Sequence, residues 1–315
     1  MCDISVVIPL YNKENYVKRA VESVLSQTNQ RFEIVIVDDG STDQSYQKAA
    51  EIKDSRIRII QQQNAGASAA RNKGITEAKA DYIAFLDADD TWNPTFLETI
   101  FRLIEKYPEA GAYATSYQII LKNQRKLVPS FDYIPPSPWE GFITHYSKSV
   151  LRDLPIISSA VVIPKKTFAH VGLFAIGHPH GEDQDMWFRI SMYRHIAYSH
   201  TNQATYYRGL PNSMCTVLHT YQPYPIIDTI KKAIDHKKVR ETSDLKEYLV
   251  KLELDYAERL INTNRLKEAY ELLEGIATTR YQLKKGKVFF LYWKERFSGH
   301  VMNRIRRARK YDRRF

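Results

Sequence analysis

The chain has 315 residues, of which 43% are hydrophobic and 26% are charged, so collagen-like and intrinsically disordered proteins are excluded. Its apolar stretches reach about six residues, far short of the ~20 that a membrane-spanning helix needs, and its N-terminus lacks the basic start of a signal peptide. The formal net charge of +10 is concentrated near one end, since residues 280–315 hold 13 Lys and Arg against two acids. We therefore expect a cytoplasmic protein with a nearly neutral body and a basic C-terminal segment.

Strand and helix patterns alternate through the first 120 residues. Apolar, β-branched runs predict buried strands at 4–10, 32–39, 57–60 and 81–87. Helical patterns follow them near 17–25 with Asn15 as cap, after a capping box of Ser41 and Gln44, over 67–79, and from Pro94 to about 107. Such β-α units predict an α/β fold with a mostly parallel, doubly wound sheet whose ligands bind beyond the carboxyl ends of the strands.

The remainder of the chain is less regular. A proline-rich loop spans about 122–155, a strand is expected at 156–164, and helices are expected from 165 and from Glu182. The segments IAYSH and ATYYR are typical of two short strands. From about 223 the pattern is helical, and residues 252–276 predict two antiparallel helices.

Five acids follow the predicted strands and would gather at the ligand edge of the sheet: Asp38, Asp39, Asp87, Asp89 and Asp90. A single acid in this position can simply cap the next helix, and this interpretation stays open for Asp39 and Asp90. The whole cluster is poorly explained by stability, because its carboxylates repel one another. It indicates a binding or catalytic site.

Five ordered motifs, at residues 6–28, 32–45, 64–92, 181–190 and 206–214, resemble those of the family-2 glycosyltransferases. The resemblance implies an inverting, non-processive nucleotide-sugar transferase with the GT-A fold, a Rossmann-like, mostly parallel sheet flanked by helices. It implies a catalytic domain over 1–222, with a nucleotide-sugar-binding half at 1–120 and an acceptor half at 121–222. Residues 223–315 would form a helical C-terminal appendage with a basic amphipathic tail.

The resemblance also implies a donor site at the strand ends. Pro9 and Tyr11 would lie beside the base, and Asp39 would accept the base N–H. Uracil, thymine and guanine all present such a donor, and only the habit of the family favours uracil and a UDP-sugar. Arg71 would approach the base or the diphosphate, although an exposed helix arginine is the simpler alternative. Asp87 would face the ribose or the donor sugar.

A departing diphosphate needs positive charge, and acids at the strand ends indicate Mg²⁺ or Mn²⁺ bound by carboxylate and phosphate oxygens. Strand alternation would point Asp87 and Asp89 the same way, and the resemblance makes Asp89 the metal ligand. A helix cap remains the alternative for this pair. Leu210 stands where many relatives carry a histidine that completes the metal shell, so His219 could substitute for it.

The acidic pair at the start of the helix near 182 suits the removal of a proton from an acceptor hydroxyl. The resemblance assigns the general base to Asp183, with Glu182 in support. The alternative is that both acids merely stabilise the helix N-terminus.

In the tail, apolar residues recur at helical spacing among arginines: Phe297, Val301, Ile305, Ala308, Tyr311 and Phe315. This pattern favours peripheral contact with an anionic membrane. Packing on the body and oligomer formation remain alternatives, and nucleic-acid binding is disfavoured because no such motif accompanies the charge.

The sequence thus predicts a metal-dependent inverting hexosyltransferase. It would move one sugar from a nucleotide-sugar to a hydroxyl of a glycan or lipid-linked acceptor in cell-surface polysaccharide synthesis. The alternative hypothesis is a non-catalytic nucleotide-sugar-binding or tethering module.

Overall fold

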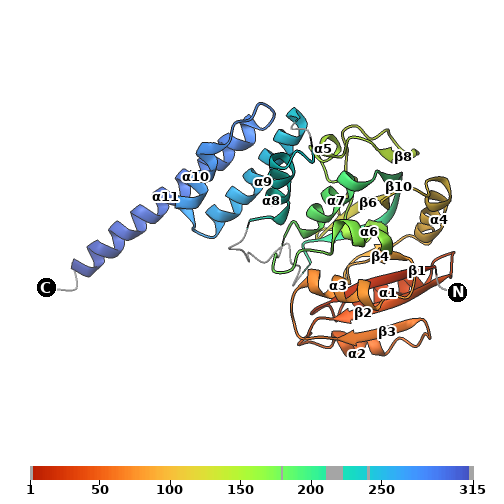
Figure 1. Cartoon of the computed structure of the whole chain (residues 1–315). Coiled ribbons are helices and arrows are strands. Elements are labelled where there is room, and N and C mark those ends of the chain that lie inside the picture. Colours follow the sequence, from red (N-terminus) through yellow and green to blue (C-terminus); the bar gives the residue numbers. More distant parts are fainter. Residues whose placement is uncertain (1–2, 179, 211–222, 240–241, 312–315) are drawn as a thin grey trace. The chain divides into compact units, whose positions relative to one another are not determined.

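The computed structural model describes residues 3–178, 180–210, 223–239 and 242–311, with side chains described as far as 296. These residues form two compact units, one before residue 240 and one after 241 (Figure 1). Helix α8 (Pro225–Asp235) packs on α7 (Glu182–Tyr193) within the first unit. This helix therefore belongs to the first unit and not to the helical C-terminal region expected at 223–315.

The first unit contains a mixed sheet in which the described residues form ten strands, with the main order β3-β2-β1-β4-β9-β6-β10-β5. Four strands of the N-terminal half are parallel neighbours: β3 (Ile57–Gln61), β2 (Phe32–Asp38), β1 (Ile4–Leu10) and β4 (Tyr82–Phe85). β9 (Val161–Pro164) runs antiparallel between β4 and β6 (Ala112–Leu121), and β6 is parallel to β10 (Ile196–Arg208). The short strands at the margin are β5 (Thr91–Trp92), β7 (Lys126–Leu127) and β8 (Glu140–Ile143). The predicted α/β fold with a mostly parallel sheet is confirmed.

Helices cover both faces of this sheet, and the side chains of β1 alternate between the two faces. Val6 and Ile8 belong to a core that also contains residues of α1 (Val17–Leu25), α2 (Ser45–Ala50) and α4 (Phe96–Lys106). Val7 faces α3 (Ala67–Glu77), where a Cβ on Gly74 would come within 2.2 Å of a Val7 methyl group. Glycine therefore lets α3 approach the central strand closely. The remaining helical segments of this unit are α5 (Tyr146–Ser149), a 3₁₀ turn (Ser158–Ala160) and α6 (Lys165–Val171).

The second unit contains three helices among the described residues: α9 (Ser243–Asn262), α10 (Leu266–Gly275) and α11 (Gln282–Tyr311). The side chain of Thr242 caps α9 by accepting a bond from Leu245 N–H, and Asn264 takes a left-handed conformation in the turn between α9 and α10. The helical pair predicted around this turn is confirmed. None of the described helices is long and apolar enough to cross a membrane.

Several local predictions were wrong at helix starts. α1 begins after Tyr16 rather than Asn15, and no side chain caps it. Ser41 does not cap α2, because its hydroxyl accepts a bond from the backbone N–H of Asn12, 29 residues away in the chain. Pro94 lies before the first turn of α4, which starts at Phe96.

The two short strands expected for the segments IAYSH and ATYYR form one strand, β10, interrupted only by shifts in register.

Candidate functional site

Strands β1, β2 and β4 are parallel and end at one edge of the sheet, and the loops that follow them are bonded to one another. The side chain of Asn12 accepts a bond from the backbone N–H of Thr42 at 2.8 Å, and Ser41 accepts one from Asn12 N–H at 3.1 Å. The left-handed conformation of Asn12 (φ 52°) turns the chain away from β1. These contacts hold the first two loops in a defined arrangement at the ligand edge.

Asp39, expected to bind the base, is buried and organises a neighbouring loop. Its carboxylate accepts bonds from Gln62 Nε2 at 2.7 Å and from the backbone N–H groups of Ala65 and Gly66 at 3.0 and 2.8 Å. Gly66 is the residue at which α3 begins. The structure thus places Asp39 at the expected edge, where it positions the start of α3.

Tyr11 and Pro9 occupy the end of β1. Pro9 lies within the strand, paired with Val37 of β2, and is partly buried. Tyr11 follows the last residue of β1 and is 42% exposed. Its ring therefore offers an accessible apolar face at the ligand edge of the sheet.

Arg71 of α3 joins two of the predicted acidic segments. It donates to Asp87 at 2.8 Å and to Glu182 at 3.0 Å, although these residues lie 16 and 111 positions away in the chain. The arginine is only 4% exposed, which excludes the interpretation of an exposed helix arginine. Burial alone would lower the pKa of Arg71, but the carboxylates of Asp87 and Glu182 raise it above its usual value. A permanent positive charge therefore links the loop after β4 to the N-terminus of α7.

Asp183 follows Glu182 in the first turn of α7. Burial and the neighbouring carboxylate of Glu182 raise the pKa of Asp183 to about 7, although the charge of Arg71 opposes the shift. The backbone N–H of Gln184 donates to Asp183 at 2.7 Å. Asp185 is different, since it is buried and accepts bonds from Arg189 and from Thr229 of α8. Among these acids of α7, Asp183 thus combines partial exposure with a pKa near neutrality.

The segment from Asp87 to Asp90 forms a turn rather than a continuation of the strand. β4 ends at Phe85, and the backbone N–H of Asp90 donates to the carbonyl of Asp87 at 2.9 Å. The prediction from strand alternation therefore does not apply to Asp87 and Asp89. The two carboxylates bind different cations, Arg71 for Asp87 and Lys13 for Asp89, the latter at 2.7 Å.

Asp90 connects this turn to the second half of the sheet. Its carboxylate accepts bonds from the hydroxyl of Ser159 at 2.5 Å and from the backbone N–H of Tyr207 at 3.1 Å. Burial and the carboxylates of Asp89 and Asp87 raise the pKa of Asp90 well above its usual value. Asp90 is therefore a structural acid that fixes the turn carrying Asp87 and Asp89.

Three contributions to the site were missed by sequence reasoning. Lys13 pairs with Asp89, and Arg19 donates to the carbonyl of Asp89 at 2.7 Å while its guanidinium stacks 3.7 Å from the centre of the Tyr207 ring. Asn72 exchanges two hydrogen bonds of 2.9 Å with the backbone of Phe174. The only signal in the sequence was the position of Lys13 just after β1, since the other contacts join distant segments.

The oxygen donors at this edge fit a hard divalent cation. Asp87 and Asp89 present carboxylates, which Mg²⁺ and Mn²⁺ prefer, and in the structure each carboxylate already neutralises a cationic side chain. Within the described part of the chain, no group of three or more His, Cys, Asp and Glu side chains could hold a metal alone. Water and the oxygens of a bound diphosphate are ligands that would complete the shell of a cation held at Asp89. Leu210 is partly buried, and His219 lies outside the described residues.

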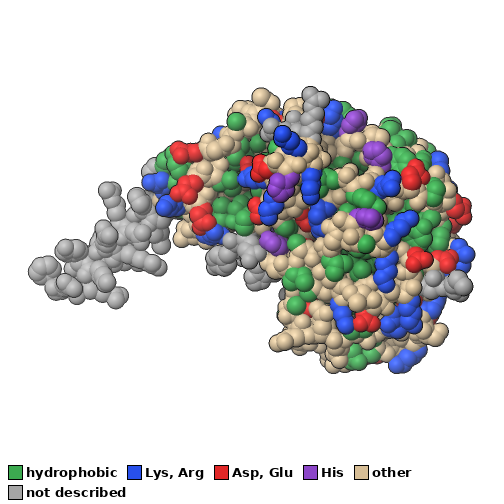
Figure 2. Space-filling model, in the orientation of Figure 1, with side chains coloured by type: hydrophobic (Ala, Val, Ile, Leu, Met, Phe, Trp, Pro, Cys, Tyr) green, Lys and Arg blue, Asp and Glu red, His purple; other side chains and the backbone are tan. Residues whose placement is uncertain are grey.

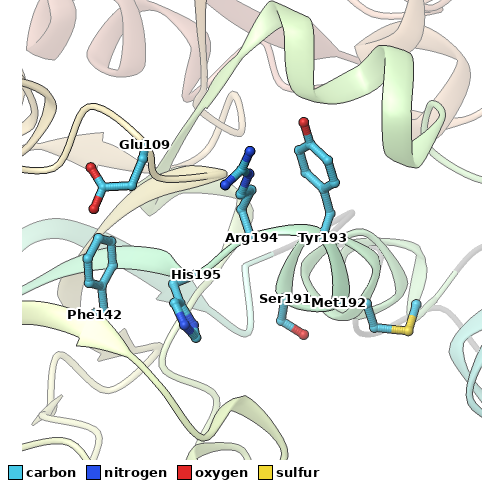
Figure 3. A pocket seen from close by; sticks show the side chains of 7 residues that line it. All are labelled: Glu109, Phe142, Ser191, Met192, Tyr193, Arg194 and His195. Atoms are coloured by element: carbon cyan, nitrogen blue, oxygen red, sulfur yellow. The ribbon is translucent and has the colours of Figure 1, made fainter. Parts of the chain in front are cut away.

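A separate cavity of about 300 Å³ lies where α7 ends and β10 begins, lined by residues that include Glu109, Arg194 and His195 (Figure 3). α7 has 12 residues, so its two ends are about 18 Å apart. Because Glu182 and Asp183 stand at the opposite end of that helix, the cavity is not part of the acidic site.

Comparisons with known proteins agree with this arrangement. The family profile described as Glycosyl transferase family 2 matches residues 5–158. The glycosyltransferase GlyA of Streptococcus pneumoniae is 42% identical over 116 residues, which cover 36% of this chain and 17% of that protein. An uncharacterized glycosyltransferase of Rickettsia felis is 36% identical over 190 residues, or 60% of this chain and 30% of that protein. The chain therefore spans less than a third of the length of both curated relatives.

A solved structure shares the fold over most of the chain. Staphylococcus aureus TarS 1–349, crystallised in complex with UDP-GlcNAc, aligns with a TM-score of 0.63 over 93% of this chain and 81% of that one. The sequence identity is 17%, so the likeness concerns the fold alone. Together with the motifs at the strand ends, these matches show that residues 5–158 form a glycosyl transferase family 2 domain.

Proposed function

We propose that the protein is an inverting glycosyltransferase that moves one sugar from a UDP-sugar to a hydroxyl group of a glycan or lipid-linked acceptor. The observation that carries this proposal is the bridge from Arg71 to both Asp87 and Glu182. It connects the loop after β4, where the donor would bind, to the helix start that presents Asp183. A donor subsite and a candidate base therefore belong to one charged cluster.

Asp183 is the general base in this proposal. An acceptor hydroxyl gives up its proton as the new C–O bond forms, and a base works best when its pKa lies near the working pH. The pKa of about 7 for Asp183 meets this condition. Attack from the side of Asp183, opposite the leaving diphosphate, inverts the anomeric centre.

The donor would bind along the ends of β1, β2 and β4. Tyr11 offers a ring face to the base, and Asp39 holds the loop that leads into α3. Asp89, together with diphosphate oxygens, would hold Mg²⁺ or Mn²⁺, which would offset the negative charge of the leaving group. UDP-GlcNAc bound to TarS supports a uridine nucleotide as the first candidate.

The acceptor is assigned only by class, as a hydroxyl compound of cell-surface polysaccharide synthesis. A loss of the sugar to water would use the same base and the same donor site. Release of UDP in the absence of acceptor is therefore the first activity to measure, with a panel of UDP-hexoses and Mn²⁺.

The test compares the wild type with Asp183→Asn, using Asp228→Asn on the exposed side of α8 as a matched control. We expect Asp183→Asn to bind UDP with unchanged affinity by calorimetry and to lose at least 100-fold in UDP release. Asp228→Asn should retain both properties. Turnover by Asp183→Asn within tenfold of the wild type would overturn the assignment of the base. Binding of UDP without turnover by the wild type would favour a non-catalytic nucleotide-sugar-binding module.

A further inference from the structure

Helix α11 presents two different faces within the described part of the second unit. Val288 and Tyr292 are 3% and 2% exposed, and the ring of Tyr292 packs 5.4 Å from that of Tyr270 of α10. Leu283 and Phe290, by contrast, are 85% and 73% exposed. At about 100° per residue, Phe290 lies roughly 160° around the helix from both buried residues. One face of α11 is therefore packed in the unit, and the opposite face is apolar and exposed.

The three exposed apolar residues lie on one side of the helix, and we call them the stripe. Leu283 and Phe290 are seven residues apart, about 20° from alignment, and Trp293, which is 41% exposed, lies one turn further on. The backbone of the same helix continues to Tyr311 (Figure 1).

Basic residues border this stripe. Lys287 and Lys294 are exposed and lie about 60° and 40° from Phe290 on the same side. Glu295 is the only acid in residues 282–311, and it lies about 140° from Phe290, away from the stripe. Elsewhere on the face drawn in Figure 2, side chains of both signs are present on both units. Aromatic and aliphatic side chains flanked by lysines are typical of a helix that lies in an anionic membrane interface.

We infer that α11 docks on a bilayer containing anionic lipid, with Leu283, Phe290 and Trp293 at the acyl boundary and Lys287 and Lys294 among the headgroups. Charge decides between this surface and a second copy of the chain. Two copies that paired through the stripe would bring their lysines together, whereas anionic headgroups neutralise them. The inference does not depend on glycosyl transfer, and its test measures no activity.

The experiment is sedimentation of the full chain with vesicles of phosphatidylcholine containing 30 mol% phosphatidylglycerol, compared with vesicles of phosphatidylcholine alone. We expect binding only to the anionic vesicles, and weaker binding at 0.5 M salt because salt screens the attraction of the lysines. A variant with Leu283→Gln, Phe290→Gln and Trp293→Gln should lose at least tenfold in partitioning. Leu283 and Phe290 are 85% and 73% exposed, so a variant with only Leu283→Gln and Phe290→Gln should melt at the temperature of the wild type and still lose partitioning.

Control variants test whether membrane binding depends on the stripe and its lysines or on any exposed apolar or basic residue. Lys287→Gln with Lys294→Gln should weaken partitioning about tenfold at low salt, since each lysine near an anionic surface is worth up to about fivefold. Lys267→Gln on α10 and Val128→Gln in the first unit change equally exposed residues away from the stripe and should have no effect. Equal pelleting of the wild type and the stripe variant would overturn the inference. A wild-type dimer by light scattering that becomes a monomer in the stripe variant, without vesicle binding, would replace the membrane by a second copy.

Discussion

Replacement of Asp183 by asparagine should make the fold more stable at alkaline pH. The pKa of this carboxyl is raised from 3.8 to about 7, chiefly by burial. The folded state therefore binds more protons than the unfolded chain between about pH 4 and pH 7, and stability falls as the pH rises through that window. Above pH 7 the folded protein carries the full cost of an ionised Asp183, which Asp183→Asn removes.

The magnitude follows from the shift. About three pKa units at 1.36 kcal/mol each correspond to roughly 4 kcal/mol, and solvent near the partly exposed side chain lowers the expected gain to about 2–3 kcal/mol. The first unit should then melt about 5–10 °C higher at pH 8. The backbone N–H of Gln184 can still donate to the asparagine oxygen.

Differential scanning fluorimetry or calorimetry of the full chain at pH 5 and pH 8 tests this prediction. The gain in stability from Asp183→Asn should be less than half as large at pH 5 as at pH 8, because wild-type Asp183 is mostly protonated in the folded state at pH 5. Asp228→Asn, which changes an exposed carboxylate, should stay within about 0.5 kcal/mol of the wild type at both values. An equal advantage at both pH values, or none at pH 8, would refute the reasoning about burial and charge.

Three further predictions concern the same edge of the sheet. The value of kcat/KM for UDP release should rise tenfold per pH unit below about pH 7 and then level off. Arg71→Gln should move the midpoint of this pH profile to higher pH, because Arg71 lowers the pKa of Asp183. An unmoved midpoint would contradict the electrostatic coupling of Arg71 to Asp183. Gly74→Ala should lower the free energy of unfolding by about 1–3 kcal/mol through its clash with Val7, whereas Gly286→Ala, with open space around it, should not. Without metal, Lys13→Gln should melt at a lower temperature than the wild type, and Mn²⁺ should raise its melting temperature by more. An equal rise in both proteins would show that Lys13 and the metal ion do not share Asp89.

The fold was largely predictable because its signals are local. Residues 4–10 and 32–38 are continuous apolar runs, and they form adjacent parallel strands buried on both faces. Helix boundaries were predicted less well, and Ser41 shows why. The backbone N–H of Gln44, three residues ahead, was the expected partner of this hydroxyl. In the folded chain the hydroxyl instead accepts a bond from the backbone N–H of Asn12, in the loop after β1. A capping box read from four residues cannot reveal such a competitor.

The sequence indicated the acids of the candidate site and Arg71, but not the ion pairs that these residues form. Asp87, Asp89 and Asp183 stand beside strands or helix starts, and their positions follow from the order of the motifs. The partners of Asp87 and Asp89 come from α3 and from the loop after β1, so Arg71 and Lys13 reach these two acids only in the folded chain. No sequence spacing specifies those pairs, because they depend on how closely α3 approaches the sheet.

Two adjacent carboxylates at the start of α7 have different environments, and this difference indicates their roles. Arg71 donates to Glu182 and to Asp87, so Glu182 helps to fix the start of the helix against the donor loop. The same arginine makes its hydrogen bonds away from Asp183, where burial and the charge of Glu182 raise the pKa to about 7. Environments that separate neighbouring carboxyl groups in this way assign one to positioning and the other to proton transfer. The environment of Asp183 therefore supports the proposal that it is the base, in addition to the family resemblance.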